Sequence, residues 1–169
     1  MKYDSSFRKR YGSAPVAVSS SVGNVPTHPH IHCEIEMLYI LSGTSEVEIA
    51  QQVYRAEKGD VFFVNPFEVH AVRGISGADY HHRCICFDAA LIADRRLAAA
   101  ITDGICTVCR YFKAGDALTQ ALIPLFEGLY AAVRENRVSL LFDATAAVSA
   151  MFSLFLQNDC IIGKETSRK

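Results

Sequence analysis

Residues 27–70 read THPHIHCEIEMLYILSGTSEVEIAQQVYRAEKGDVFFVNPFEVH, and this stretch decides the fold. Two of its runs, from Glu34 to Ile40 and from Val61 to Val64, are rich in the β-branched and aromatic residues that suit a pleated, half-buried surface. Turn-forming residues follow the first run at 42–44 and precede the second at 58–60. The stretch therefore predicts short strands joined by tight turns.

Strand patterns extend on both sides of this stretch. The expected strands cover residues 32–41, 45–50, 52–56, 61–64, 70–73 and 81–87, with a short strand at 15–18. Strands of this length and spacing predict a closed antiparallel barrel or jelly roll. After Asp88 the pattern changes: residues 89–101 predict a short helix, and residues 105–111 predict a further strand or an extended connection.

Two amphipathic helices are predicted near the C-terminus. Apolar residues recur at steps of three and four from Leu118 to Val133, and again from Leu141 to Phe155. The short polar link between these stripes predicts an antiparallel helical hairpin. Pro124 lies inside the first stripe, so that helix either is kinked there or begins its regular part nearby.

The two stripes carry more apolar surface than a helical pair needs for itself, and we expect the excess to pack both on the barrel and on a second subunit. The residues expected at the dimer interface are Leu122, Phe126, Leu129, Val148, Met151 and Phe155.

Composition excludes some classes of function. The chain has 169 residues and 50% hydrophobic content, which is ample for the core of one domain. Its formal net charge of −1 offers no basic field for nucleic acid, so we do not expect it to hold DNA by itself. Six cysteines without an export signal predict free thiols in a reducing cytoplasm. No run approaches a membrane span, and we expect no membrane partner.

Four side chains form a candidate metal-ligand set. On one continuous strand, His30, His32 and Glu36 would share a face because side chains alternate with a period of two, and His70 would lie on a nearby strand. Imidazoles with one carboxylate suit iron, manganese, nickel, zinc or copper. The same residues could instead line a polar pocket without metal.

Cysteines form two further patterns. His82, Cys84 and Cys86 alternate along one strand and would share a face, although the pattern does not show which face is inside. Both of these cysteines are also typical of small apolar core residues, which is the role we favour. Cys106 and Cys109 have the Cys-x-x-Cys spacing, but in a strand they would point to opposite faces and no second pair completes a zinc site.

The pattern His30-x-His32-x-x-x-Glu36, followed by Gly43, Gly59-Asp60 and the NPFEVH of residues 65–70, resembles the cupin signature. More closely, HIHCEIEMLYILSG with KGDVFFVNPFEVHAV is similar to the N-terminal sensory domain of AraC-family transcription regulators. The likeness continues through HHRCICFDAALIAD and the final helical pair. It implies a mainly β fold: a cupin barrel, or double-stranded β-helix, followed by a C-terminal α-helical hairpin that dimerises.

The resemblance also implies a function. A sensory domain of this family binds a small effector in the barrel and passes the signal to a C-terminal helix-turn-helix domain, which binds promoter DNA. The expected effector pocket is lined by His30, His32, Glu36, Leu38, His70, His82 and Cys84. Sensory domains of this kind mostly work without metal, so we expect no cofactor and keep a divalent transition metal at His30, His32, Glu36 and His70 as the alternative. A sugar is plausible by resemblance, but no residue pattern separates it from an aromatic acid, an amino acid or a peptide.

These inferences define four segments: an N-terminal arm (1–27), a cupin barrel (28–112), a helical hairpin for dimerisation (113–160) and a linker (161–169). Nothing in the sequence is typical of a recognition helix with basic flanks, so we expect an excised sensory domain whose DNA partner is reached only through a missing C-terminal domain. We expect a homodimer.

An alternative of a different class is a small cupin metalloenzyme, of the dioxygenase or isomerase type. The second motif argues against it, because only three residues separate Pro66 from His70 and the glycine usual in cupins is missing. This shorter form resembles the AraC branch. We therefore expect no enzyme and assign no catalytic residue. A third alternative is a dimeric cupin without any ligand.

Overall fold

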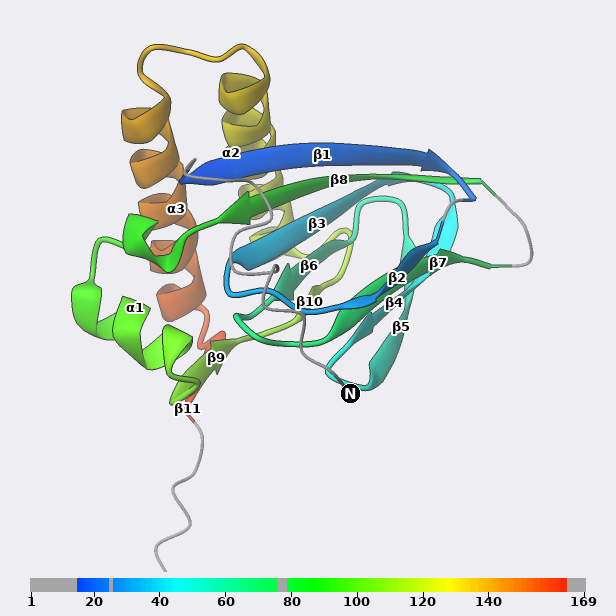
Figure 1. Cartoon of the computed structure of the whole chain (residues 1–169), viewed down its shortest axis with the longest axis horizontal. Coiled ribbons are helices and arrows are strands. Elements are labelled where there is room, and N and C mark those ends of the chain that lie inside the picture. Colours follow the sequence, from blue (N-terminus) through cyan, green and yellow to red (C-terminus); the bar gives the residue numbers. More distant parts are fainter. Residues whose placement is uncertain (1–14, 25, 76–78, 164–169) are drawn as a thin grey trace, which may run out of the picture.

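Two antiparallel sheets form the body of the molecule (Figure 1), in a computed structural model that describes residues 15–24, 26–75 and 79–163. The strands are β1 (Val16–Gly23), β2 (Thr27–His30), β3 (Ile35–Ser42), β4 (Thr44–Ile49), β5 (Gln52–Glu57), β6 (Val61–Val64), β7 (His70–Gly74), β8 (Tyr80–Phe87), β9 (Cys106–Val108), β10 (Tyr111–Phe112) and β11 (Ile161–Gly163). One sheet has the order β1-β8-β3-β6-β10 and the other β2-β7-β4-β5, while β11 pairs with β9. This confirms the predicted cupin architecture.

The helical elements are a short 3-10 turn η2 (Ala89–Leu91), α1 (Arg95–Thr102), α2 (Ala117–Arg134) and α3 (Leu140–Gln157). The predicted helix at 89–101 is therefore two elements, and each begins at an aspartate. Asp88 accepts a hydrogen bond from Ala90 N, and Asp94 accepts from the backbone of the first turn of α1. Helix α2 begins at Ala117 and continues through Pro124. Its regular part therefore begins well before the proline.

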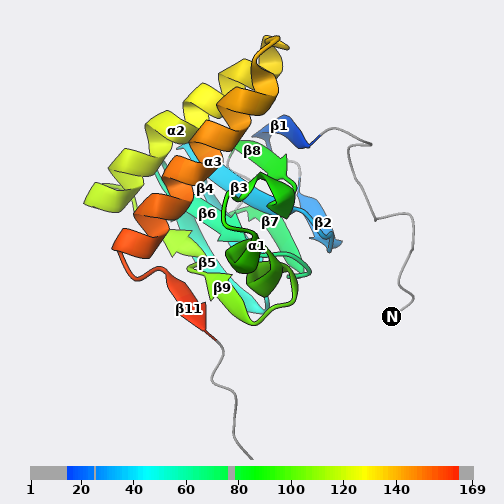
Figure 2. The ribbon, with the colours of Figure 1, turned by 90° about the vertical axis from the view of Figure 1, so that its left-hand side faces the viewer.

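Both faces of the five-stranded sheet are buried. One face meets the four-stranded sheet and contributes residues such as Leu38, Ile40 and Phe62 to an inner core. The other face packs against the helical hairpin, with Met37 and Phe63 in that second core. Figure 2 shows α2 and α3 side by side across this face. Burial on two sides explains why the central strands are continuous apolar runs rather than alternating ones.

The six residues predicted to form a dimer interface lie in this second core. Each of them is at most 2% exposed within a single chain: Leu122, Phe126, Leu129, Val148, Met151 and Phe155. Leu129 reaches only the floor of a groove on the outer side of the hairpin, and the other five have almost no surface to offer a second subunit, so the prediction that these residues form the interface is wrong. The apolar stripes face the sheet because its outer face, including Phe63 and Ile85, is itself apolar and needs cover.

Two predicted boundaries shift. Strand β1 lies in the second half of the expected N-terminal arm, and its whole length pairs with β8 in a register that runs from Val16↔Phe87 to Gly23↔Tyr80. The first three residues of the expected linker form β11, which pairs with β9. Residues 1–14 of the arm and 164–169 of the linker lie outside the described residues.

Gly43 makes the turn between β3 and β4. Its φ is +76°, and a Cβ at this position would lie 2.3 Å from the backbone oxygen of Asp79. Only glycine fits both the left-handed conformation and the close approach of the segment before β8. The predicted turn at residues 42–44 is therefore confirmed.

One helix of the described residues is long and apolar enough to cross a membrane. Helix α3 has 18 residues and a mean hydropathy of 1.5, so the expectation that no run approaches a membrane span is wrong. Yet its buried side chains pack against the sheet and α2. Because the core helix of a globular domain meets the same criterion, its length and hydropathy decide nothing about a membrane.

Phe155 tests the contact between hairpin and barrel. Its ring centroid lies 5.5 Å from that of Phe63 on β6 and 5.3 Å from that of Phe112 on β10. Phe155→Ala should lower the free energy of unfolding by about 3–5 kcal/mol, because it leaves a cavity between the helix and the sheet. Leu156→Ala on the same helix is the control, since Leu156 is 57% exposed and should change stability by less than about 0.5 kcal/mol. Urea unfolding measures both, and equal effects would contradict this packing.

Candidate functional site

His30, His32, Glu36 and His70 come together, as the sequence predicts. One potential ligand atom of each lies within 4.8 Å of those of the other three. The ring centroid of His70 is 4.1 Å from that of His30 and 4.9 Å from that of His32. Three members are buried and His30 is half-buried. The predicted convergence is therefore confirmed.

The reason for the convergence differs from the expected one. His30 ends β2 and pairs with His70 on β7, in the four-stranded sheet. His32 lies in the connection that follows, and Glu36 is on β3 in the other sheet. No continuous strand joins the first three residues. Two sheets that face each other bring the four side chains together, which only the closed barrel can do.

The Nδ1 atoms of the three histidines are held by backbone carbonyl groups. His30 Nδ1 lies 2.8 Å from His28 O, His32 Nδ1 lies 3.1 Å from Glu34 O, and His70 Nδ1 lies 2.9 Å from Glu68 O. A carbonyl oxygen can only accept, so Nδ1 carries the proton in each ring. This leaves Nε2 as the atom that each ring can offer to a ligand or metal.

Glu36 is the charged centre of the cluster. Its Oε2 lies 3.1 Å from His32 Nε2 and 3.6 Å from His70 Nε2. Burial raises the pKa of this carboxyl, but hydrogen bonds and positive charge from His32 and His70 outweigh burial and hold the pKa well below its usual value. The same Oε2 accepts from Cys86 Sγ at 3.1 Å. Glu36 is therefore a buried anion, and a buried anion requires a compensating charge.

The four residues fit a divalent transition metal. Three imidazole nitrogens and one carboxylate oxygen are the donors that iron, manganese, nickel or zinc accept. Within the described residues, the buried His70 Nε2 makes a long ion pair with Glu36 Oε2 at 3.6 Å and no shorter hydrogen bond, so it can serve as a metal ligand. A bound metal would supply a Lewis-acidic centre with open positions.

The other predicted pocket residues lie on the same inner face. The register between β3 and β8 pairs Leu38 with Cys84 and Ile40 with His82. The ring of His82 stacks on Tyr80, with centroids 5.6 Å apart, and burial lowers its pKa. His82 Nδ1 is buried without a partner among the described residues. Leu38 and Cys84 belong to the inner core, which agrees with the core role favoured for Cys84.

Sequence reasoning missed Cys86 as a site residue. Cys86 pairs with Glu36 across β3 and β8 and lies beside Cys84 on the same face. The hydrogen bond with Cys84, burial and the charge of Glu36 all raise the pKa of the Cys86 thiol. The alternation of His82, Cys84 and Cys86 already predicts a shared face, but the expected pocket ended at Cys84 because both cysteines are typical of small core residues. Two serines were also missed: Ser19 and Ser21 of β1 lie opposite Cys84 and His82.

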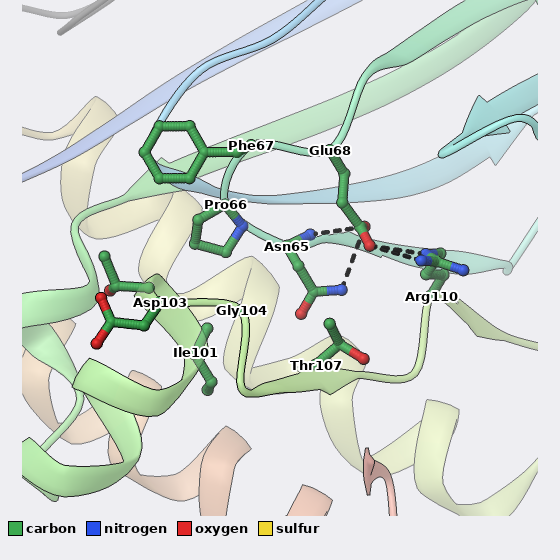
Figure 3. A pocket seen from close by; sticks show the side chains of 10 residues that line it. Asn65, Pro66, Phe67, Glu68, Ile101, Asp103, Gly104, Thr107 and Arg110 are labelled. Carbon is green, nitrogen blue, oxygen red and sulfur yellow. Dashed lines mark hydrogen bonds and ion pairs between the residues drawn. The ribbon is translucent and has the colours of Figure 1, made fainter. Parts of the chain in front are cut away.

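A cavity of about 330 Å³ lies beside this cluster, between the β6–β7 loop and the α1–β9 connection (Figure 3). Glu68 projects into it and pairs with Arg110 at 2.7 Å. The same loop also supports the cluster, because Phe67 N donates to His32 O at 2.9 Å and Glu68 O holds His70. The residues that line the cavity are Asn65, Pro66, Phe67, Glu68, Ile101, Thr102, Asp103, Gly104, Thr107 and Arg110. Residues 65–68 of the NPFEVH motif form one wall, but the other walls come from separate segments, so the sequence did not predict this cavity.

The charge of Glu36 predicts a pH effect on stability. Its folded pKa is lowered from 4.5, so the stabilisation is present above 4.5 and is lost as the pH falls through the lowered folded value. Glu36→Gln keeps the shape and removes the charge. In chelator-treated protein, wild type should lose more unfolding free energy than the variant as the pH falls below 4.5. Urea unfolding across acid pH measures this, and parallel curves for the two proteins would refute it.

Parts of this chain are similar to solved cupin structures. Among solved structures, a Cupin 2 conserved barrel domain protein from Salinispora arenicola CNS-205 is 24% identical with a TM-score of 0.41, over 48% of this chain and 71% of that one. A cupin-like protein from Thermotoga maritima is 22% identical with a TM-score of 0.42, over 46% of this chain and 61% of that one. A predicted oxalate decarboxylase from Thermotoga maritima is 22% identical with a TM-score of 0.38, over 43% and 64%. No curated protein matches the sequence.

The family comparison covers most of the chain. The family described as AraC-like ligand binding domain matches residues 24–149, which include every strand of the two large sheets except β1 and most of the hairpin. This is well over half of the sequence. The chain therefore belongs to the AraC-like ligand-binding domain family.

Proposed function

We propose that this domain senses a small polar molecule inside its barrel for an AraC-like transcription regulator of the cytoplasm. Membership of a ligand-binding family implies a small-molecule ligand. One observation supports the barrel interior as its place: His82 Nδ1 is buried there without a hydrogen-bond partner among the described residues. Unpaired buried polar atoms cost free energy, and a ligand with hydroxyl or carboxylate groups, such as a sugar or an acid, would pair them.

Strand β8 connects the proposed pocket with the hairpin. His82 faces the inner side, whereas the next residue, Arg83, pairs with Glu127 of α2. The guanidinium of Arg83 also lies 4.7 Å from the ring centroid of Tyr130 on the same helix. A ligand that repositions His82 would therefore act on the barrel–hairpin contact. An effector shifts the state of an attached domain only if it binds one arrangement better than another.

In this proposal the output is a separate helix-turn-helix domain that binds promoter DNA. The described part of this chain contains the barrel, α1 and the hairpin, and β11 follows α3 directly. A change at the hairpin would reach the following residues through β11, which is paired with β9. DNA binding then depends on the effector without any contact between the effector and DNA.

A second candidate function is a cupin metalloenzyme. The observation that favours it is the cluster of His30, His32, Glu36 and His70, which fits a divalent metal. A metalloenzyme would carry stoichiometric metal after purification and would turn over a substrate that chelation blocks. A sensory domain would instead bind its ligand without turnover.

We also propose a homodimer, through the outer face of the hairpin rather than through the buried stripes. A groove of about 450 Å³ runs between α2 and α3 and is lined mainly by small and apolar residues. These are Pro124, Leu125, Gly128, Leu129, Arg137, Asp143, Ala146, Ala147 and Ala150. On α3, Leu141 is 55% exposed and Phe142 is 79% exposed. Small residues along such a groove allow close approach of a helix from a second copy.

Ligand binding can be tested with adjacent histidines on opposite faces of β8. Sugars, aromatic acids and amino acids would be screened by thermal unfolding, because a bound ligand raises the midpoint temperature. His82→Ala should abolish the shift produced by any hit, whereas His81→Ala should keep it, since His81 bonds Ser20 on the other side. A hit retained by His82→Ala would contradict the proposed pocket. In a chain that includes the helix-turn-helix domain, the same hit should change promoter affinity.

The dimer can be tested with one charge in the groove. Ala146→Glu should produce a monomer in light scattering, because a carboxylate would be buried without a partner at the interface. Gln52→Glu on β5 adds the same charge at an exposed site outside the hairpin. This control should keep the molar mass of the wild-type dimer in light scattering. A dimer that survives Ala146→Glu would exclude this face.

A further inference from the structure

The inner face of the barrel holds a second group of metal-ligating atoms, made by Glu36, Cys84 and Cys86. Their ligand atoms all lie within 4.8 Å of one another. The two sulfurs are 3.6 Å apart, and Cys86 Sγ lies 3.1 Å from Glu36 Oε2. The three residues are at most 4% exposed. Residues two apart on β8 share a face, and the pairing with β3 adds the carboxylate.

These separations are close to those of a tetrahedral zinc site. With Zn–S bonds of about 2.3 Å and Zn–O bonds of about 2.1 Å, two sulfurs would be about 3.8 Å apart and a sulfur and an oxygen about 3.6 Å apart. The observed 3.6 Å and 3.1 Å require only small side-chain movements. A thiol that serves only as a small core residue does not need an ionised carboxylate beside it.

The donor set determines the class of ion. Thiolate sulfur favours zinc, cadmium and copper(I) over magnesium, calcium or manganese. Glu36 adds a negative charge that a cation would balance. His82 lies one step further along the same face of β8. The set therefore differs in chemistry from the three imidazoles on the other side of Glu36.

We propose that Glu36, Cys84 and Cys86 bind a thiophilic ion of the Zn²⁺ or Cd²⁺ type, at a site that shares only Glu36 with the histidine cluster. Binding breaks two S–H bonds and forms two S–metal bonds, and the two protons leave to solvent with no change of oxidation state. Water completes the coordination. This site does not depend on the regulator role, because an unliganded barrel would also bind the ion.

The thiol site and the histidine cluster share the carboxylate of Glu36, so an ion at one affects the other. Glu36 Oε2 is the acceptor for His32 as well as for Cys86. An ion held by the thiols would draw this oxygen away from His32 Nε2. The thiophilic ion would therefore alter the histidine side of the barrel interior.

Cadmium is the probe of choice, because Cd²⁺ bound to thiolate gives an ultraviolet charge-transfer band that imidazole and carboxylate ligands do not give. Titration of the whole reduced chain should develop this band at one equivalent. Cys84→Ser with Cys86→Ser should lose it. Cys109→Ser with Cys160→Ser is the matched control and should keep it, and so should His30→Ala with His70→Ala, which removes only the other site.

A second variant is needed because the Cys84→Ser/Cys86→Ser protein could lose the band by misfolding. Replacing Cys33, Cys106, Cys109 and Cys160 by serine leaves Cys84 and Cys86 as the only thiols. This protein should still show the band and release two protons per ion. Absence of the band in it, or persistence of the band in the Cys84→Ser/Cys86→Ser variant with native circular dichroism, would overturn the proposal. Neither result bears on effector binding, which the His82 and His81 variants test separately.

Discussion

The pairing of β3 with β8 is the constraint on which the rest of the structure depends. Its register places Glu36 opposite Cys86 and Leu38 opposite Cys84 on the inner face. The intervening residues, Met37 and Ile85, face the hairpin. A slip of one residue would turn every side chain to the other face. It would put the buried carboxylate under the helices and remove the apolar surface that α2 and α3 cover. Two cores on opposite faces therefore fix the register more firmly than one core would.

The buried charge at Glu36 is the second organising feature. A carboxylate in this position needs donors, and His32, His70 and Cys86 all approach the same oxygen. Backbone carbonyl groups of Glu34 and Glu68 accept from Nδ1 of His32 and His70 and so fix the orientation of both rings. Loops and strand ends of both sheets therefore hold the polar cluster. Such a cluster adds chemistry to the barrel at some expense in stability, because an apolar group of the same shape would carry no desolvation cost. Its presence in a ligand-binding family supports a role in binding rather than in folding.

The central strands also explain how a barrel could communicate with a hairpin. Alternate residues of β8 face the inner cavity side and the helices, as His82 and Arg83 illustrate. In the proposed mechanism, a displacement of His82 would reach α2 through the adjacent Arg83 of the same strand. The buried aromatic contacts of Phe155 with Phe63 and Phe112 make this joint tightly packed, and packed joints shift between discrete arrangements rather than deform gradually.

The sequence by itself determined the short strands, the turns and the two amphipathic helices, because short-range periodicity and turn residues are local properties of the chain. It also singled out His30, Glu36 and His70, but not the barrel closure that brings them together. Tertiary structure decided the rest. Both faces of β3 and β6 carry buried apolar residues, so periodicity could not show that Met151 and its neighbours cover the sheet instead of a second subunit. Nor could it show that Cys86 meets Glu36, or that His30 and His32 leave a common strand. Those relations depend on which sheet each strand joins and in which register, and residues far apart in the chain meet only when the barrel closes.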